Sequence, residues 1–332
     1  MSHEARIDDP GLVAFSDRLH FVSSGHGCER VGLTHPTLNG SLNAVLEPSP
    51  SPENNMPFLK VGVENASDIS IYYEDLGSGR PVVLVHGWPL DGASWERQTS
   101  MLLAAGFRVI TYDRRGFGRS DKPSEGYDFN TMTADLAKLI EKLDLRSVAL
   151  VGFSMGGGEV ARYLGKYGDE RVSQVCFMSS IVPALKKTTE NGEGIDPSVF
   201  ETMKKNMIED RFAFLTAFTH QFYNKSLLSG THVSDEVVQH AANVAGRSSY
   251  GAMLQCVDAW LEDFRGDIAA IKIPTLVIHG DADKVLPIEA TGERTAKLIP
   301  GAQLHVVAGG PHGLNWTHAT EVNMQLLRFL KS

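Results

Sequence analysis

The chain has 332 residues, 42% of them hydrophobic and 21% charged, which suits a soluble protein with one large α/β domain and an insertion, or with two modest domains. The formal net charge is −9, from 31 Lys and Arg against 40 Asp and Glu, and no long basic stripe is present, so nucleic acid is not an expected partner. No run approaches about 18 apolar residues, so we expect no membrane span. The three cysteines, Cys28, Cys176 and Cys256, are widely spaced, so we expect them to be free thiols and not to form a metal site.

Residues 1–57 differ in composition from the rest of the chain. They are rich in Ser, Pro, Gly, Asn and His and end in a proline-rich stretch, and proline lacks the N–H that helices and sheets require. We predict a poorly ordered, non-catalytic extension with one short helix near residues 9–19, while a regulatory arm or a true start at Met56 stays open. Glu4 and Asp8 interrupt the N-terminus, so no secretory signal is predicted and cytoplasm is the default location.

Strand and helix patterns alternate from Phe58 onward. Short apolar runs typical of buried parallel strands are separated by segments with helical spacing. This alternation predicts an α/β fold with a mostly parallel sheet and helices on both faces, formed by residues 58–182 and 272–332, with ligands bound beyond the carboxyl ends of the strands. The expected strands are 69–73, 81–86, 107–112, 147–151, 174–178, 275–279 and 303–307, and the expected helices are 94–105, 131–143, 156–164, 289–298 and 318–330.

Residues 183–271 break this rhythm. They contain no convincing strand, and the segments 197–209, 211–223, 234–245 and 250–264 have helical patterns. We interpret the insertion as a helical cap over an active site. Seven apolar side chains of the cap are candidates for an acyl pocket, and we expect two or three of them to contact substrate: Phe212, Phe214, Phe218, Phe222, Met253, Val257 and Trp260.

One five-residue motif, Gly152-Phe153-Ser154-Met155-Gly156, carries the strongest functional signal. It has the form G-x-S-x-G and stands between the apolar run 147–151 and the helical segment 156–164. Strand, sharp turn and helix in this order are similar to the nucleophile elbow of α/β-hydrolases, in which glycines tolerate the strained turn and its close packing. Ser154 is therefore the predicted nucleophile.

A nucleophilic serine requires a base, and the base requires an orienting acid. In an elbow-type enzyme the acid and then the histidine follow the serine along the chain. Asp281 and Asp283 both follow the strand 275–279, and we favour Asp283, because Asp281 suits a bond to the local backbone. His312 lies between glycines just after the strand 303–307 and is the predicted general base.

The oxyanion of a tetrahedral intermediate requires preorganised N–H donors. One expected donor is the backbone of Met155, directly after the nucleophile. The other is expected in the loop after the strand 81–86, where Pro89 has no N–H and Trp88 is the better candidate.

Four motifs in this order resemble the cofactor-free haloperoxidase, perhydrolase and arylesterase branch of the α/β-hydrolases: His86 to Gly92, Tyr112 to Ser120, Gly152 to Gly158 and Pro311 to Gly313. The resemblance runs from Phe58 to the end of the chain. It implies the α/β-hydrolase fold, Ser154, Asp283 and His312 as a catalytic triad, and Trp88 and Met155 as oxyanion donors. It also implies ester hydrolysis, peracid formation when hydrogen peroxide replaces water, and halide oxidation by the peracid.

The predicted substrates are a small ester or carboxylic acid and hydrogen peroxide, with no cofactor and no metal. Nothing in the sequence fits nicotinamide or metal enzymes, because no G-x-G-x-x-G follows a strand and no H-E-x-x-H occurs. Ser154 argues against the aspartate-using epoxide hydrolases and dehalogenases. A lactonase, a carbon–carbon bond hydrolase and a non-catalytic ligand-binding receptor remain alternative functions. A homo-oligomer is open as an assembly state. We expect the charged loop 113–121 to be a hydrogen-bonded scaffold.

Overall fold

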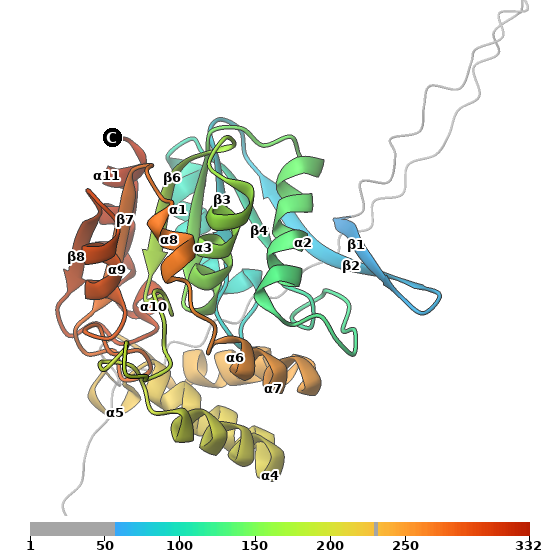
Figure 1. Cartoon of the computed structure of the whole chain (residues 1–332), viewed down its shortest axis with the longest axis vertical. Coiled ribbons are helices and arrows are strands. Elements are labelled where there is room, and N and C mark those ends of the chain that lie inside the picture. Colours follow the sequence, from blue (N-terminus) through green and yellow to red (C-terminus); the bar gives the residue numbers. More distant parts are fainter. Residues whose placement is uncertain (1–56, 229–231) are drawn as a thin grey trace, which may run out of the picture. The chain divides into compact units, whose positions relative to one another are not determined.

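An eight-stranded sheet forms the centre of the fold (Figure 1). The computed structural model describes residues 57–228 and 232–332, so the predicted extension and its short helix, with the exception of Pro57, lie outside the described residues. The strand order is β1-β2-β4-β3-β5-β6-β7-β8. The strands are β1 Phe58–Glu64, β2 Ser67–Leu76, β3 Pro81–Val85, β4 Arg108–Tyr112, β5 Val148–Phe153, β6 Val172–Met178, β7 Thr275–Gly280 and β8 Gln303–Val307.

The sheet is parallel from β4 to β8 and antiparallel at its β1–β2 edge. The predicted mostly parallel sheet is thus confirmed. The sequence patterns predicted β2 and the six strands that pair in parallel, β3 to β8, but they did not predict β1. Only Val61 of β1 is fully buried, so this edge strand lacks the continuous apolar run that marks a central parallel strand.

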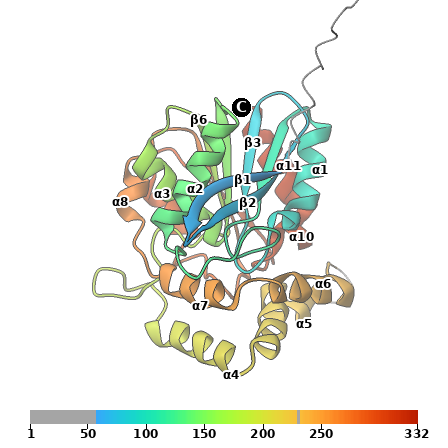
Figure 2. The same ribbon diagram turned by 90° about the vertical axis from the view of Figure 1, so that its right-hand side faces the viewer.

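Helices cover both faces of the sheet, as predicted (Figures 1 and 2). Helices α1 and α11 contact each other on one face, whereas α2, α3, α8 and α9 form a connected row on the other. A one-turn helix, α10, precedes α11 and was not predicted. The bounds are α1 Glu96–Ala104, α2 Phe129–Lys142, α3 Met155–Tyr167, α8 Arg265–Ala269, α9 Gly292–Leu298, α10 Leu314–Thr317 and α11 Ala319–Leu330, with a 3-10 helix η1 at Gly92–Trp95.

The segment between β6 and β7 contains helices α4 to α8, and of these α4, α5, α6 and α7 lie together beyond one end of the strands in both views (Figures 1 and 2). The long helix α4 bends at Asp210, where φ is −152° and ψ is 95°. The Asp210 carboxylate accepts hydrogen bonds from the N–H groups of Phe212 and Ala213, so it caps a second helix at the boundary that the sequence predicts. The bounds are α4 Pro197–Phe222, α5 Lys225–Leu228, α6 Asp235–Gly246 and α7 Tyr250–Ala259.

Helix α7 ends five residues before the predicted boundary at 264. The Phe264 N–H donates to the carbonyl oxygen of Pro183 at 2.9 Å, and Asp263 forms an isolated bridge with Ala184. The chain after Ala259 therefore leaves the helix to pair with the start of the insertion, which helical periodicity cannot predict. None of the helices in residues 57–228 and 232–332 combines the length and apolar character that a membrane span requires.

Candidate active site

Ser154 occupies the turn between β5 and α3 in a strained backbone conformation. Its φ is 54° and its ψ is −120°, a region that non-glycine residues rarely adopt. The Ser154 N–H donates to the carbonyl oxygen of Met178 at 2.9 Å, which ties the turn to the end of β6. The strained turn points the hydroxyl out of the carboxyl end of the sheet, where loops from neighbouring strands can reach it.

Two loops bring His312 and Asp283 to this serine. His312 follows β8 and Asp283 follows β7, and the carboxyl ends of these parallel strands lie at the same edge of the sheet as that of β5. His312 Nε2 lies 2.9 Å from Ser154 Oγ, and His312 Nδ1 lies 2.7 Å from Asp283 Oδ2. The three side chains form one hydrogen-bonded line, although they stand at positions 154, 283 and 312 of the chain.

The Asp283 carboxylate is buried and fully hydrogen-bonded. Its Oδ1 accepts from the N–H groups of Val285 at 2.9 Å and Leu286 at 2.8 Å. Its Oδ2 faces His312, and the Nε2 atom of His279 lies 3.2 Å away from the same oxygen. Burial by itself raises the pKa of Asp283, but the imidazoles of His312 and His279 outweigh it and hold the pKa well below its ordinary value. Asp283 is therefore an anion at neutral pH.

The loop after β3 packs directly against the serine. A Cβ on Gly87 would lie 3.0 Å from Ser154 Cβ, so the backbone that leads into Trp88 runs beside the nucleophile. Met155 is the first residue of α3, and the N–H at this position has no acceptor inside the helix. The backbones of both predicted oxyanion donors, Trp88 and Met155, thus belong to the two segments that flank Ser154.

A buried ion pair joins these two flanking segments. Arg114 Nε donates to Glu159 Oε2 at 2.7 Å, and both side chains are at most 1% exposed. The same guanidinium donates through Nη2 to the carbonyl oxygen of His86 at 2.9 Å, and the Arg114 N–H donates to His86 Nε2 at 2.9 Å. Because Glu159 lies on α3 and His86 directly follows β3, Arg114 holds the helix and the loop together.

The charged loop 113–121 is hydrogen-bonded throughout, in the manner of a scaffold. Asp113 accepts from the N–H groups of Gly92 and Arg119, and Arg115 forms a two-bond ion pair with buried Asp135. Asp121 Oδ2 accepts from the N–H of Ser70 at 2.8 Å. None of these contacts involves Ser154, Asp283 or His312.

Asp281, His305 and His86 make contacts that do not involve Ser154. Asp281 accepts from the Gly309 N–H at 2.7 Å and so fixes the loop backbone, and His305 pairs with Glu321 at 2.8 Å. Burial, together with the Arg114 guanidinium, lowers the pKa of His86 well below its ordinary value. Cys176 and Cys256 are free and buried, and Cys28 lies outside the described residues. In the described parts of the chain, no cluster of three or more His, Cys, Asp or Glu side chains could hold a metal ion.

Two aromatic side chains enclose His312: Phe222, one of the seven candidate pocket residues, and Phe153, which the sequence analysis did not place in the site. The ring of Phe153 lies 5.2 Å from the His312 ring, between centroids, and the ring of Phe222 lies 5.0 Å away at nearly a right angle. Phe153 was visible as the residue before the nucleophile in the G-x-S-x-G motif. Phe222 ends α4, and no local signal indicates that the insertion reaches back to His312.

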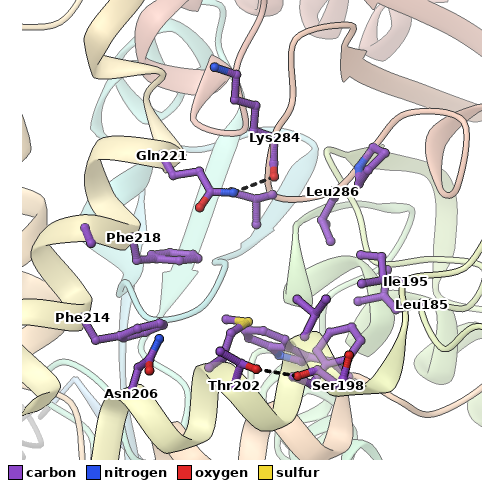
Figure 3. A pocket seen from close by; sticks show the side chains of 17 residues that line it. Leu185, Ile195, Ser198, Thr202, Asn206, Phe214, Phe218, Gln221, Lys284 and Leu286 are labelled. Carbon is purple, nitrogen blue, oxygen red and sulfur yellow. Dashed lines mark hydrogen bonds between the residues drawn. The ribbon is translucent and has the colours of Figure 1, made fainter. Parts of the chain in front are cut away.

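A cavity of about 560 Å³ lies between the insertion and the loop that follows Asp283 (Figure 3). Phe214 and Phe218 project into it from α4, opposite Leu286. Three of the seven candidate pocket residues line it, namely Phe214, Phe218 and Trp260. The others do not, because Phe212 is 62% exposed, Phe222 packs on His312, and Met253 and Val257 are fully buried in the core.

The cavity wall contacts the loop beside Ser154. The ring of Trp88 lies 4.9 Å from that of Trp260 and 5.2 Å from that of Phe218, both edge to face. On the opposite side, the cavity-lining Leu286 donates its N–H to Asp283. The cavity is therefore bounded by residues that directly contact Trp88 and Asp283.

A model of the α/β-hydrolase fold family matches residues 80–319. The chain belongs to this family. It is 54% identical over 276 residues to a protein of Synechocystis sp. that is provisionally named a non-heme chloroperoxidase, and the match covers 83% of this chain and 100% of the relative. The family and the relatives together identify this α/β-hydrolase as an enzyme of the haloperoxidase and esterase branch.

Two further relatives carry names from the same branch. A crystal structure of bromoperoxidase from Bacillus anthracis is 48% identical, has a TM-score of 0.80 and covers 83% of this chain and 99% of its own. A bifunctional esterase/perhydrolase of Acinetobacter calcoaceticus is 32% identical over 276 residues, which cover 81% of this chain and 99% of the relative. The resemblance that the sequence motifs indicate is thus confirmed.

Proposed function

We propose that this α/β-hydrolase is a serine esterase of small acyl esters, with Ser154, His312 and Asp283 as its catalytic triad. The observation that carries the proposal is the line of two hydrogen bonds, 2.9 Å from Ser154 to His312 and 2.7 Å from His312 to Asp283. Because Asp283 is ionised, it holds the imidazole with Nδ1 protonated and leaves Nε2 to accept the serine proton.

In the proposed reaction, Ser154 Oγ attacks the ester carbonyl while His312 Nε2 takes its proton. The backbone N–H groups of Met155 and Trp88 stabilise the oxyanion of the tetrahedral intermediate. His312 then gives the proton to the leaving alcohol as the bond to that alcohol breaks, and an acyl-enzyme remains on Ser154. Asp283 stabilises the charged imidazole between these two transfers.

We further propose that either water or hydrogen peroxide resolves the acyl-enzyme. His312 takes a proton from the attacking molecule and returns it to Ser154 Oγ as the acyl bond breaks. Water yields the carboxylic acid, and hydrogen peroxide yields the peracid, which can transfer an oxygen atom to halide and become the carboxylate. The relative named as a bifunctional esterase/perhydrolase supports this pair of activities.

The helices of residues 183–271 serve, in this proposal, as a cap that carries the substrate pocket. The cavity of about 560 Å³ is lined mainly by apolar side chains and lies against Trp88, so it offers room for the acyl or the alcohol group of an ester. A charged substituent would lose its hydration among Phe214, Phe218 and Trp260, so uncharged apolar groups are favoured.

The test is pre-steady-state hydrolysis of p-nitrophenyl acetate. Wild type is expected to release p-nitrophenol in a burst, and Ser154→Ala is expected to lose the burst and to turn over slower by on the order of 10³-fold or more while remaining folded. Added hydrogen peroxide is expected to speed release in wild type and to produce peracetic acid.

Ser179→Ala is the matched control. Ser179 is a fully buried serine directly after a strand, and its hydroxyl has no partner among the described residues, so its loss is expected to leave the burst intact. A burst that survives in Ser154→Ala would contradict the triad. No acceleration and no peracid with hydrogen peroxide would restrict the enzyme to hydrolysis.

A further inference from the structure

A second histidine, His279, lies against the carboxylate of Asp283. It is the fifth residue of β7, it is completely buried, and its Nε2 atom lies 2.9 Å from the carbonyl oxygen of Leu286 and 3.2 Å from Asp283 Oδ2. A histidine at the end of a buried core strand is ordinarily a structural residue. His279 contacts Asp283 Oδ2, the same oxygen that binds His312, and this contact links His279 to the acid of the proposed triad.

The partners of His279 determine which nitrogen carries its proton. A carbonyl and a carboxylate oxygen can only accept hydrogen bonds, so Nε2 must be protonated. His279 Nδ1 is buried and has no partner among the described residues, and the nearest part of α9 is Gly292, where a Cβ would come within 2.7 Å of that nitrogen. A second proton on Nδ1 would be buried without an acceptor, so the ring is neutral with Nε2–H.

The carboxylate of Asp283 thereby receives four donors. Val285 and Leu286 supply two backbone N–H groups to Oδ1, and His312 supplies one ring N–H to Oδ2. The Nε2–H of His279 is shared between the carbonyl oxygen of Leu286 at 2.9 Å and Oδ2 at 3.2 Å. A carboxylate has about four acceptor sites, so this set occupies the group and prevents its rotation. The Leu286 residue is held twice, because its N–H donates to Asp283 and its carbonyl accepts from His279.

From this geometry we propose that His279 is a positioning residue, which aims Asp283 at His312 and moderates the charge that His312 experiences. The inference rests on the proposed triad. The titratable groups that face the ring are Asp283 in the loop after β7 and, on the same oxygen, His312 from the loop after β8, while α9 faces it with Gly292. Because His279 donates to Oδ2, it withdraws part of the negative charge that would otherwise stabilise protonated His312.

The test compares His279→Phe, which keeps a ring but removes the donor, with His279→Gln, whose side-chain amide can still donate from nearly the same position. We expect His279→Phe to lower kcat at least about tenfold with little change in KM, since Asp283 can then turn away from His312. We expect the acidic limb of its kcat/KM profile to move to higher pH by about half a unit, because the unshared carboxylate favours protonated His312. His279→Gln should restore most of the rate and the wild-type limb.

Thr295→Val provides a control for the loss of a buried hydrogen bond in the same region. Thr295 lies on α9, is 1% exposed and donates to the carbonyl oxygen of Val182 at 2.7 Å, but it does not contact the acid. It is expected to reduce stability without moving the pH profile. A His279→Phe enzyme with wild-type kcat and limb, or equal losses in the Phe and Gln variants without a shift of the limb, would overturn the proposal.

A measurement on the wild-type protein covers the case in which His279→Phe does not fold. Two-bond ¹H–¹⁵N correlation spectra of protein labelled with ¹⁵N-histidine distinguish the two neutral tautomers, and the His279 signal is assigned by its absence in His279→Gln. At pH 7.5 we expect a proton on Nε2 and none on Nδ1, and the opposite tautomer or a doubly protonated ring would overturn the proposal. The proposed triad is tested separately, because only a Ser154→Ala enzyme that keeps its burst would contradict it.

Discussion

At the residue scale, the site depends on positions that tolerate no added atoms. The strained turn at Ser154 brings the first turn of α3 against the end of β3, and a Cβ on Gly156 would overlap the carbonyl oxygen of Val85. A Cβ on Gly152 would in turn overlap the backbone of Gly156. The two glycines of the G-x-S-x-G motif therefore allow two backbone segments to approach closely, and they contribute no chemistry of their own.

We expect Gly156→Ala to destabilise the protein by about 1–3 kcal/mol and to lower esterase activity, because the new methyl group pushes α3, with its Met155 N–H, away from the loop that carries Trp88. Urea unfolding and p-nitrophenyl acetate turnover measure the two effects. Gly266→Ala in α8 is the matched control, since a Cβ there meets nothing within 4 Å. An alanine that is tolerated at Gly156 with unchanged turnover would show that the close approach is not required.

At the scale of the elements, a buried charge pair holds the helix of the nucleophile to the neighbouring strands. Glu159 of α3 accepts from Arg114 and from the hydroxyl group of Tyr112 at the end of β4. Arg114 also donates to the carbonyl oxygen of His86, so one guanidinium connects the ends of β4 and β3 to α3. Burying two charges is costly, and removing one partner leaves the other charge without compensation.

Glu159→Gln is therefore expected to lower the free energy of unfolding by about 3 kcal/mol or more, because the Arg114 charge stays buried without a carboxylate. Thermal or urea unfolding at pH 7 checks this value. The matched control is Arg146→Ala, which breaks an ion pair with Asp144 whose side chains are 65% and 71% exposed and should leave stability unchanged within error. A similar effect of the two substitutions would contradict the special role of the buried pair.

At the scale of the whole molecule, the family fold accounts for only part of the chain. The full length of the Synechocystis relative corresponds to 83% of this chain, and the family model begins at residue 80. The described elements from β1 to α11 form one continuous hydrophobic core. The proposed triad, the oxyanion donors and the cavity all lie within residues 88–312.

Deletion of residues 1–55 is accordingly expected to leave esterase activity within about twofold of the full chain, because all proposed catalytic and pocket residues remain. Steady-state kinetics with p-nitrophenyl acetate on both proteins makes the comparison, and equal unfolding transitions would serve as the control for intact folding. A large loss of activity in a folded truncated protein would instead indicate that the extension acts on the core.

The sequence by itself determined the fold class, seven of the eight strands and the order of the Ser, Asp and His motifs, since apolar runs, glycines and motif order are local properties of the chain. Sequence reasoning favoured Asp283 as the acid, but the tertiary structure decided that Asp283 reaches His312 while Asp281 bonds Gly309, because this outcome depends on the path of a loop between two strands. It also decided the contact of His279 with the acid and the approach of Phe222 to His312. These contacts join residues that are separated along the chain, and only the packing of strand ends and cap helices brings them within hydrogen-bond or van der Waals distance.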